Sequence, residues 1–190
     1  IEEGATVVGK AMFVASNRPI AYELYKEIID LRPEWAEEKI CADGEILSEQ
    51  EKQQIKPMER IKMVMTRDKD DEQALYDLLG TKEYRRDLDL QFKTSKSNFK
   101  IAILVDMWLT GFDVPFLDSM YIDKPVKRHN LIQTISRVNR KYQDKQKGLI
   151  IDYIGIKKQM NLALAHYSKS DSSNIEEIKH SIVIVKDHLD

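Results

Sequence analysis

The 190-residue sequence lacks several features that would each point to a particular class of protein. Cys41 is the only cysteine, which excludes an internal disulfide and any metal site built from several cysteines. No apolar run approaches the roughly 20 residues that a membrane-spanning helix needs, and the acidic start IEEG lacks the apolar core of a signal peptide. We therefore expect a soluble cytoplasmic protein, with no membrane partner, and its start at Ile1 suggests a piece of a longer chain.

The sequence also lacks a strong net charge, because 30 Lys and Arg residues nearly balance 32 Asp and Glu residues. Any affinity for nucleic acid must therefore come from a local basic segment. Such a segment runs from Lys124 to Lys147, where eight basic residues stand against one acid, Asp144. It suits a polyanion such as a nucleotide or a nucleic-acid backbone. The alternative is an ordinary solvated surface.

The opening stretch GATVVGKA, residues 4–11, fits the first seven positions of the phosphate-binding loop G-x-x-x-x-G-K-[ST]. Such a loop works as the turn from a strand into a helix. Here Lys10 instead leads into an apolar strand, and Ala11 stands where the magnesium-binding Ser or Thr should be. We interpret the stretch as a loop entering the first strand, so any ATP chemistry must be sought elsewhere in the chain or outside it.

Apolar runs alternate with helical patterns along residues 1–156, which we interpret as one domain. Strands are predicted at 10–16, 61–66, 101–106, 119–123 and 148–155, and helices at 17–31, 71–79, 84–93 and 129–141. Strands that are apolar throughout predict an α/β fold whose parallel sheet has helices on both faces. Residues 34–60 are interpreted as an irregular connection. Residues 157–190 are interpreted as the start of a helical region.

Ligands of such sheets bind beyond the carboxyl ends of the strands. DMWLTGFDVP, residues 106–115, follows one strand directly. In it Gly111 allows close backbone approach to a ligand, Thr110 offers a hydroxyl to a phosphate oxygen, and Asp113 can order the loop or accept from a sugar hydroxyl. Trp108 and Phe112 flank the loop, where core packing is favoured over base stacking. The alternative is an ordinary strand-to-helix turn with a capping Asp.

A second candidate segment is QTISRVNRK, residues 133–141. Gln133, Arg137 and Arg140 are spaced i, i+4 and i+7, so they share one face of a helix. The opposite face carries apolar residues that would pack on the sheet: Leu131, Ile135 and Val138. Two arginines on a rigid face suit the charge of a transferring phosphoryl group, where one such arginine can be worth ~10³ in rate. A solvated basic face is the alternative.

Taken in order, these stretches resemble the second motor domain of superfamily-two helicases and translocases. The resemblance covers most of residues 10–166 and is closest to the restriction subunit of type I restriction–modification enzymes. MFVASNRPIAYELY resembles motif IV, ILVDMWLTGFDVP resembles motif V, and YIDKPVKRHNLIQTISRVNRKYQDKQKGLIIDYIGI resembles motif VI with its trailing strand. The match extends well beyond a generic helicase pattern. Ser136 stands where helicases often have Gly, and we expect no loss of packing from it.

The resemblance implies a RecA-like fold, the second of two, with ATP bound in the cleft between them. The phosphate loop and the acidic box for Mg²⁺ would belong to the first domain, outside this chain. Arg137 and Arg140 would be arginine fingers. Three further residues would serve the nucleotide: Gln133, Asp113 and Gly111. Ser16, Arg18 and Thr110, together with Gly111, would contact the DNA phosphate backbone.

The partners that the resemblance implies are double-stranded DNA, the first motor domain and nuclease domain of the same parent chain, and separate modification and specificity subunits. This piece alone would neither cut DNA nor hydrolyse ATP well. One alternative is the motor of another superfamily-two enzyme, such as a type III restriction subunit or a repair helicase. Others are a non-catalytic nucleic-acid-binding module with a RecA-like shell and a scaffold whose basic face docks a protein.

Overall fold

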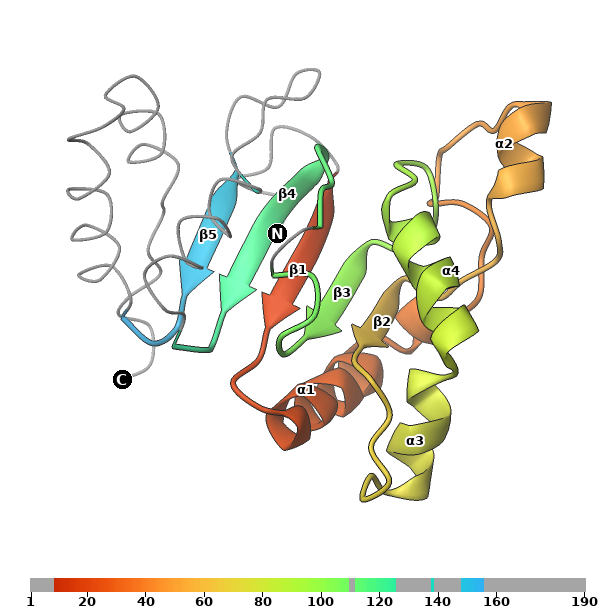
Figure 1. Ribbon diagram of the computed structural model, residues 1–190. Coiled ribbons are helices and arrows are strands. Elements are labelled where there is room, and N and C mark those ends of the chain that lie inside the picture. The colour runs from red at the N-terminus through yellow and green to blue at the C-terminus, as the bar shows by residue number, and fades with distance from the viewer. Residues whose placement is uncertain (1–8, 110–111, 126–137, 139–147, 156–190) are drawn as a thin grey trace. The chain divides into compact units, whose positions relative to one another are not determined.

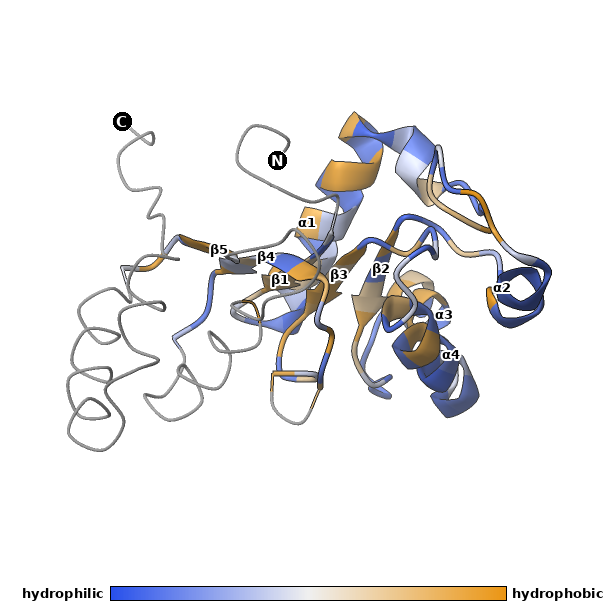
Figure 2. Cartoon of the chain, turned by 90° about the horizontal axis from the view of Figure 1, so that it is seen from above, coloured by the Kyte–Doolittle hydropathy of each residue, from blue (hydrophilic) through white to orange (hydrophobic). Residues whose placement is uncertain are grey.

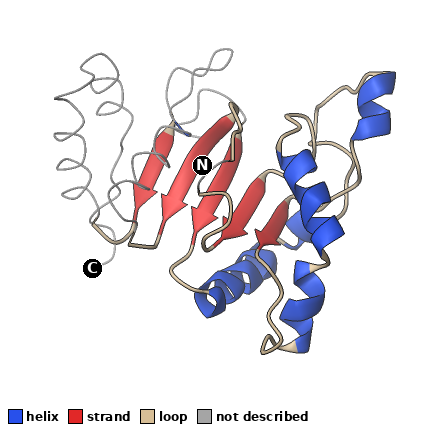
Figure 3. Ribbon diagram, in the orientation of Figure 1, coloured by secondary structure: helices blue, strands red, loops and turns tan. Residues whose placement is uncertain are grey.

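The computed structural model describes residues 9–109, 112–125, 138 and 148–155. Its five strands form one sheet in the order β2-β3-β1-β4-β5, and its strand pairs are parallel (Figures 1 and 3). The strands are β1 Lys10–Val14, β2 Ile61–Val64, β3 Ile101–Leu104, β4 Leu117–Ile122 and β5 Leu149–Asp152. The predicted α/β fold and all five predicted strands are confirmed, and the parallel sheet is consistent with a RecA-like domain.

The described residues divide into two compact units. The first comprises the stretch up to Ser16 together with the chain from Trp108 onward, and it holds β1, β4 and β5. In it Phe13 pairs with Tyr121, and Tyr121 with Ile151. The second unit, Asn17–Met107, holds β2, β3 and the described helices other than that at Val138. Most strand residues in both units are buried, which explains why the strands appear in the sequence as continuous apolar runs.

The helices of the second unit begin and end at residues that satisfy their free backbone groups. Helix α1, Arg18–Leu31, starts where the Asn17 side chain accepts a hydrogen bond from the amide of Ile20 at 2.9 Å. Helix α3, Gln73–Leu79, ends at Gly80, whose φ is +61°. Helix α4, Lys82–Phe92, begins earlier than predicted because the Thr81 hydroxyl accepts from the amide of Tyr84 at 3.2 Å.

These helices cover both faces of the β2–β3 pair. Seen along the sheet, α1 lies on one face, and α3 and α4 lie on the other, as Figure 2 shows. The prediction of helices on both faces is therefore confirmed for this unit. The predicted helix at 129–141 lies outside the described residues apart from Val138, and the predicted helical region at 157–190 lies wholly outside them.

The predicted irregular connection at 34–60 contains two short helical elements, a 3-10 helix at Pro33–Ala36 and α2 at Glu49–Gln54. Ser48 and Glu51 form a capping box: the Ser48 hydroxyl accepts from the Glu51 amide, and the Glu51 carboxylate accepts from the Ser48 amide at 2.8 Å. Lys96 also pairs with Glu51 at 2.9 Å. No helix in the described part of the chain is long and apolar enough to span a membrane.

Candidate functional site

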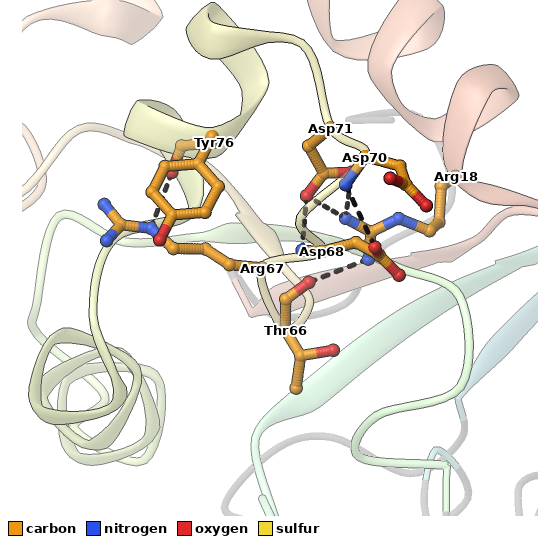
Figure 4. A network of polar contacts seen from close by, with 7 residues as sticks. All are labelled: Arg18, Thr66, Arg67, Asp68, Asp70, Asp71 and Tyr76. Carbon is orange, nitrogen blue, oxygen red and sulfur yellow. Dashed lines mark hydrogen bonds and ion pairs between the residues drawn. The ribbon is translucent and has the colours of Figure 1, made fainter.

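In the second unit, Arg18 connects the start of α1 to the loop that follows β2 (Figure 4). Its Nη1 donates to the carbonyl oxygen of Thr66 at 2.8 Å, and its Nη2 donates to both carboxylate oxygens of Asp71. The Arg18 side chain is 29% exposed, whereas that of Asp71 is 6% exposed. A planar guanidinium held by three acceptor atoms has little rotational freedom left.

The Asp71 carboxylate also orders its own loop. It accepts a hydrogen bond from the backbone amide of Asp68 at 2.7 Å, and the Asp71 amide donates back to the carbonyl of Asp68 at 3.2 Å. Burial alone would raise the pKa of the Asp71 carboxyl. The hydrogen bonds from Arg18 and Asp68, with the positive charge of Arg18, instead hold that pKa below its ordinary value. Asp71 is therefore ionised at neutral pH and fixed in place.

In the first unit, Ser16 follows β1 and its hydroxyl donates to the Asp123 carboxylate at 3.4 Å. Asp123 follows β4, and its amide donates to the carbonyl of Val14 at 2.9 Å. Both residues therefore lie at the carboxyl ends of neighbouring parallel strands, the edge where ligands bind in such sheets. The predicted DNA-contacting residue Ser16 is thus at the expected edge, and it is hydrogen-bonded there to an acid.

Asp152 ends β5 with a buried carboxylate. Its Oδ1 accepts from the amides of Ile154 and Gly155, both at 3.0 Å, which turns the chain out of the strand. Among the described residues, its buried Oδ2 has no hydrogen-bond partner. A buried carboxylate oxygen without a donor lowers the stability of the fold. Oδ1 of Asp152 therefore stabilises the turn after β5, whereas Oδ2 is destabilising.

The loop after β3 carries an unusual backbone conformation. Trp108 has a φ of +66°, a region that a bulky residue rarely occupies and that is enriched at ligand-binding sites. Its ring stacks on Phe112 with centroids 4.1 Å apart and an interplanar angle of 4°. Phe112 is buried, as the core-packing interpretation expected, and the neighbouring Asp113 is exposed. Thr110 and Gly111 lie outside the described residues.

Of the second candidate segment, the structure describes only Val138, which is helical and fully buried. A Cβ atom added to Gly148 would lie 2.2 Å from the carbonyl oxygen of Val138, so the backbones there are in close contact. The burial of Val138 agrees with its predicted place on the apolar face of that segment. The predicted functional residues of that segment, Gln133, Arg137 and Arg140, lie outside the described residues.

Lys10, the lysine of the phosphate-loop-like stretch, begins β1 and is 0% exposed. Its Nζ lies 5.6 Å from the centroid of the Phe116 ring. The lysine is thus buried at the amino end of a strand, away from the edge where parallel sheets bind phosphates. This agrees with the interpretation of the stretch as a loop entering β1.

Sequence reasoning identified Ser16 and Arg18 but missed the acids that hold them, Asp123 and Asp71. Asp123 carried a usable signal, because it is the last residue of the predicted strand 119–123 and so belongs to the same edge as Ser16. Asp71 carried none, since it lies 53 residues from Arg18 within the polar run TRDKDDE.

Comparison with known proteins decides the family. A family model described as type I restriction enzyme subunit R domain 3 matches residues 8–155. The chain belongs to the type I restriction enzyme subunit R family. It is 35% identical over 189 residues to the type I restriction enzyme HindI endonuclease subunit of Haemophilus influenzae, across 97% of this chain.

A second relative in the family is the putative type I restriction enzyme MjaIXP endonuclease subunit of Methanocaldococcus jannaschii, 41% identical over 161 residues and 84% of this chain. The chain spans only 16% and 13% of the lengths of these two relatives. The predicted relationship to the restriction subunit of type I restriction enzymes is confirmed.

Proposed function

We propose that this chain is the second RecA-like motor domain of an ATP-dependent DNA-translocating restriction subunit. The proposal rests on the family membership together with the position of DMWLTGFDVP in this chain. That segment follows the carboxyl end of β3, and its Asp113 is exposed. This loop offers a ligand an exposed acidic residue and a constrained backbone at Trp108. The proposed parent enzyme is a DNA-cleaving, ATP-hydrolysing complex.

The described residues do not fit the phosphate loop or Mg²⁺ site that such an enzyme needs. Lys10 is buried, and no group of three or more His, Cys, Asp or Glu residues in the described ranges could hold a metal ion. We therefore assign the phosphates and Mg²⁺ of ATP mainly to the first motor domain, and no step performed by the metal is placed on this chain.

In the proposed mechanism, Arg137 and Arg140 reach across the cleft and neutralise charge on the transferring γ-phosphoryl group. Gln133 contacts the same phosphate. Asp113 and Gly111 connect the loop after β3 to the nucleotide or to the arginine-bearing segment. Closing and opening the cleft would alternate the grip of the two domains on DNA.

The proposed DNA contacts are Ser16, Arg18 and Thr110, which would bind backbone phosphates. Such contacts position a protein on DNA without reading its sequence, as a translocase requires. Double-stranded DNA would be the substrate. The modification and specificity subunits and the nuclease domain of the parent chain would be the partners.

Duplex-stimulated ATP hydrolysis by the full parent chain in its assembled complex tests this function. We expect Arg137→Ala to lower hydrolysis a hundredfold or more while duplex binding is retained, because an arginine finger stabilises charge only in the transition state. Arg128→Ala removes the same side chain from the same basic segment, away from the predicted helix face, and serves as the control. Unchanged hydrolysis in Arg137→Ala would favour a non-catalytic DNA-binding module instead.

A further inference from the structure

The donors of Arg18 are only partly used within the domain. A guanidinium has five N–H groups in one plane. One hydrogen of Nη1 is directed to the Thr66 carbonyl, and Nη2 serves the two Asp71 oxygens. Among the described contacts, the Nε–H and the second hydrogen of Nη1 are unused, and 29% of the side chain is exposed.

The acceptors that hold Arg18 are themselves fixed. Asp71 is bound by the Asp68 amide at 2.7 Å, and its side chain is 6% exposed. Thr66 contributes a backbone oxygen two residues after the end of β2. The plane of the guanidinium is therefore set by rigid partners, so its unused donors point in a defined direction before any ligand arrives.

The neighbouring Arg67 cannot replace Arg18, because its guanidinium is held by Tyr76. The Nε of Arg67 donates to the carbonyl of Tyr76 at 2.7 Å, and its guanidinium lies 4.2 Å from the centroid of the Tyr76 ring (Figure 4). Asp68, Asp70 and Glu72 add negative charge to the loop. Lys69, which is exposed in the same loop, is a further cation that could attract a phosphate, so the part of the attraction with a fixed direction comes from Arg18.

We propose that Asp71 is a positioning residue for the DNA backbone: it holds Arg18 so that the two unused N–H groups meet a phosphate oxygen. The inference rests on the proposed function, in which Arg18 contacts DNA. It leads to an expectation whose sign is unusual. Removing a negative charge ordinarily strengthens binding to a polyanion, whereas removing the charge of Asp71 should weaken it.

The test compares Asp71→Asn with Asp70→Asn in the full parent chain within its complex, using a nonspecific duplex over a range of salt concentrations. Both variants remove one negative charge, but Asp70 is exposed, and it is its backbone amide that donates to the Asp68 carboxylate at 3.1 Å. We expect Asp71→Asn to bind duplex about three- to tenfold more weakly, the loss of one charge-assisted hydrogen-bonded contact. Asp70→Asn should bind as tightly as wild type or more tightly.

The salt dependence separates positioning from a general loss of structure. Losing one phosphate contact lowers the steepness (the absolute slope) of log K against log salt by about 0.9. We expect that decrease in Asp71→Asn and in Arg18→Gln, and no further decrease in the double variant. Arg18→Lys keeps the charge without the planar fork and should behave like Arg18→Gln, which provides the same test if Asp71→Asn does not fold.

Two results would overturn the inference alone: duplex binding by Asp71→Asn that matches Asp70→Asn, or an Arg18→Lys variant with the wild-type slope. A wild-type complex that does not bind duplex would overturn the proposed function, and the inference with it. An Arg18→Gln variant with an unchanged slope would remove Arg18 from the DNA contacts and leave the arginine-finger proposal standing.

Discussion

The two units of this domain hold their candidate residues in different ways. In Asn17–Met107, Arg18 is fixed by a charge-assisted pair with a nearly buried Asp71. In the other unit, Ser16 makes a long 3.4 Å hydrogen bond, Asp152 buries an oxygen that lacks a described partner, and Trp108 has a strained backbone. The first arrangement suits a fixed contact, whereas the second suits loops that complete their bonds when a ligand binds.

The largest expected change in the free energy of unfolding is in the core of the unit Asn17–Met107. Phe92→Ala should destabilise it by ~3–5 kcal/mol, because Phe92 is fully buried and packs on Phe99 with ring centroids 4.9 Å apart. Urea unfolding followed by circular dichroism measures the change. The exposed Leu90→Ala on the same helix should cost less than ~0.5 kcal/mol, and a similar cost for both variants would contradict the described packing.

A smaller effect is expected in the other unit from Gly148→Ala. The added Cβ would lie 2.2 Å from the Val138 carbonyl oxygen, so the backbones must separate at a cost of ~1–3 kcal/mol. Gly44→Ala is the control. Nothing lies within 4 Å of its added Cβ, so the only strain in this variant is that of an alanine at positive φ. Thermal unfolding should show the larger loss for Gly148→Ala; the reverse order would argue against close contact at Val138.

Two acids, one in each unit, allow the comparison between units to be sharpened: the partly buried Asp71 and the buried Asp152. Asp71→Asn should cost ~1–3 kcal/mol because it leaves Arg18 without its ionic partner. Asp152→Asn keeps the oxygen that accepts from Ile154 and Gly155 and removes a buried charge, so its cost should stay below ~1 kcal/mol. Equal losses on urea unfolding would show that Asp152 has a strong partner that the described residues do not include.

The smallest expected effect depends on pH. Backbone hydrogen bonding to Ser48, aided by Lys96, lowers the pKa of Glu51 to about 2. Because the folded pKa lies below that of an unfolded glutamate, the stabilisation of α2 is complete above pH ~4.5 and is lost as pH falls toward 2. Amide hydrogen exchange of residues 49–54 in wild type and Glu51→Gln measures this. The protection is corrected for the intrinsic exchange rate at each pH. If it then depends on pH equally in wild type and Glu51→Gln, the capping box is excluded as the cause of the pH dependence.

The sequence predicted the strands well and the contacts between loops poorly. Short apolar runs bounded by polar residues, such as IAILVD, are typical of a buried parallel strand, and β3 lies within that run. The box at Ser48 and Glu51 was missed although S-x-x-E is a local signal, because the surrounding residues are polar. The pairing of Arg18 with Asp71 depends on the path of the chain between them, which no local pattern records.

Hydrogen exchange of the full complex, with and without duplex DNA and a non-hydrolysable ATP analogue, tests the central claim most directly. The claim is that, in each unit, the loops at the carboxyl ends of the strands contact the ligands of the proposed motor. We expect ligand-dependent protection in peptides covering residues 15–18, 66–72 and 106–115. Peptides at the amino ends of strands, around Lys10 and Leu117, should not change. Protection confined to those amino ends, with none at the three loops, would contradict the account.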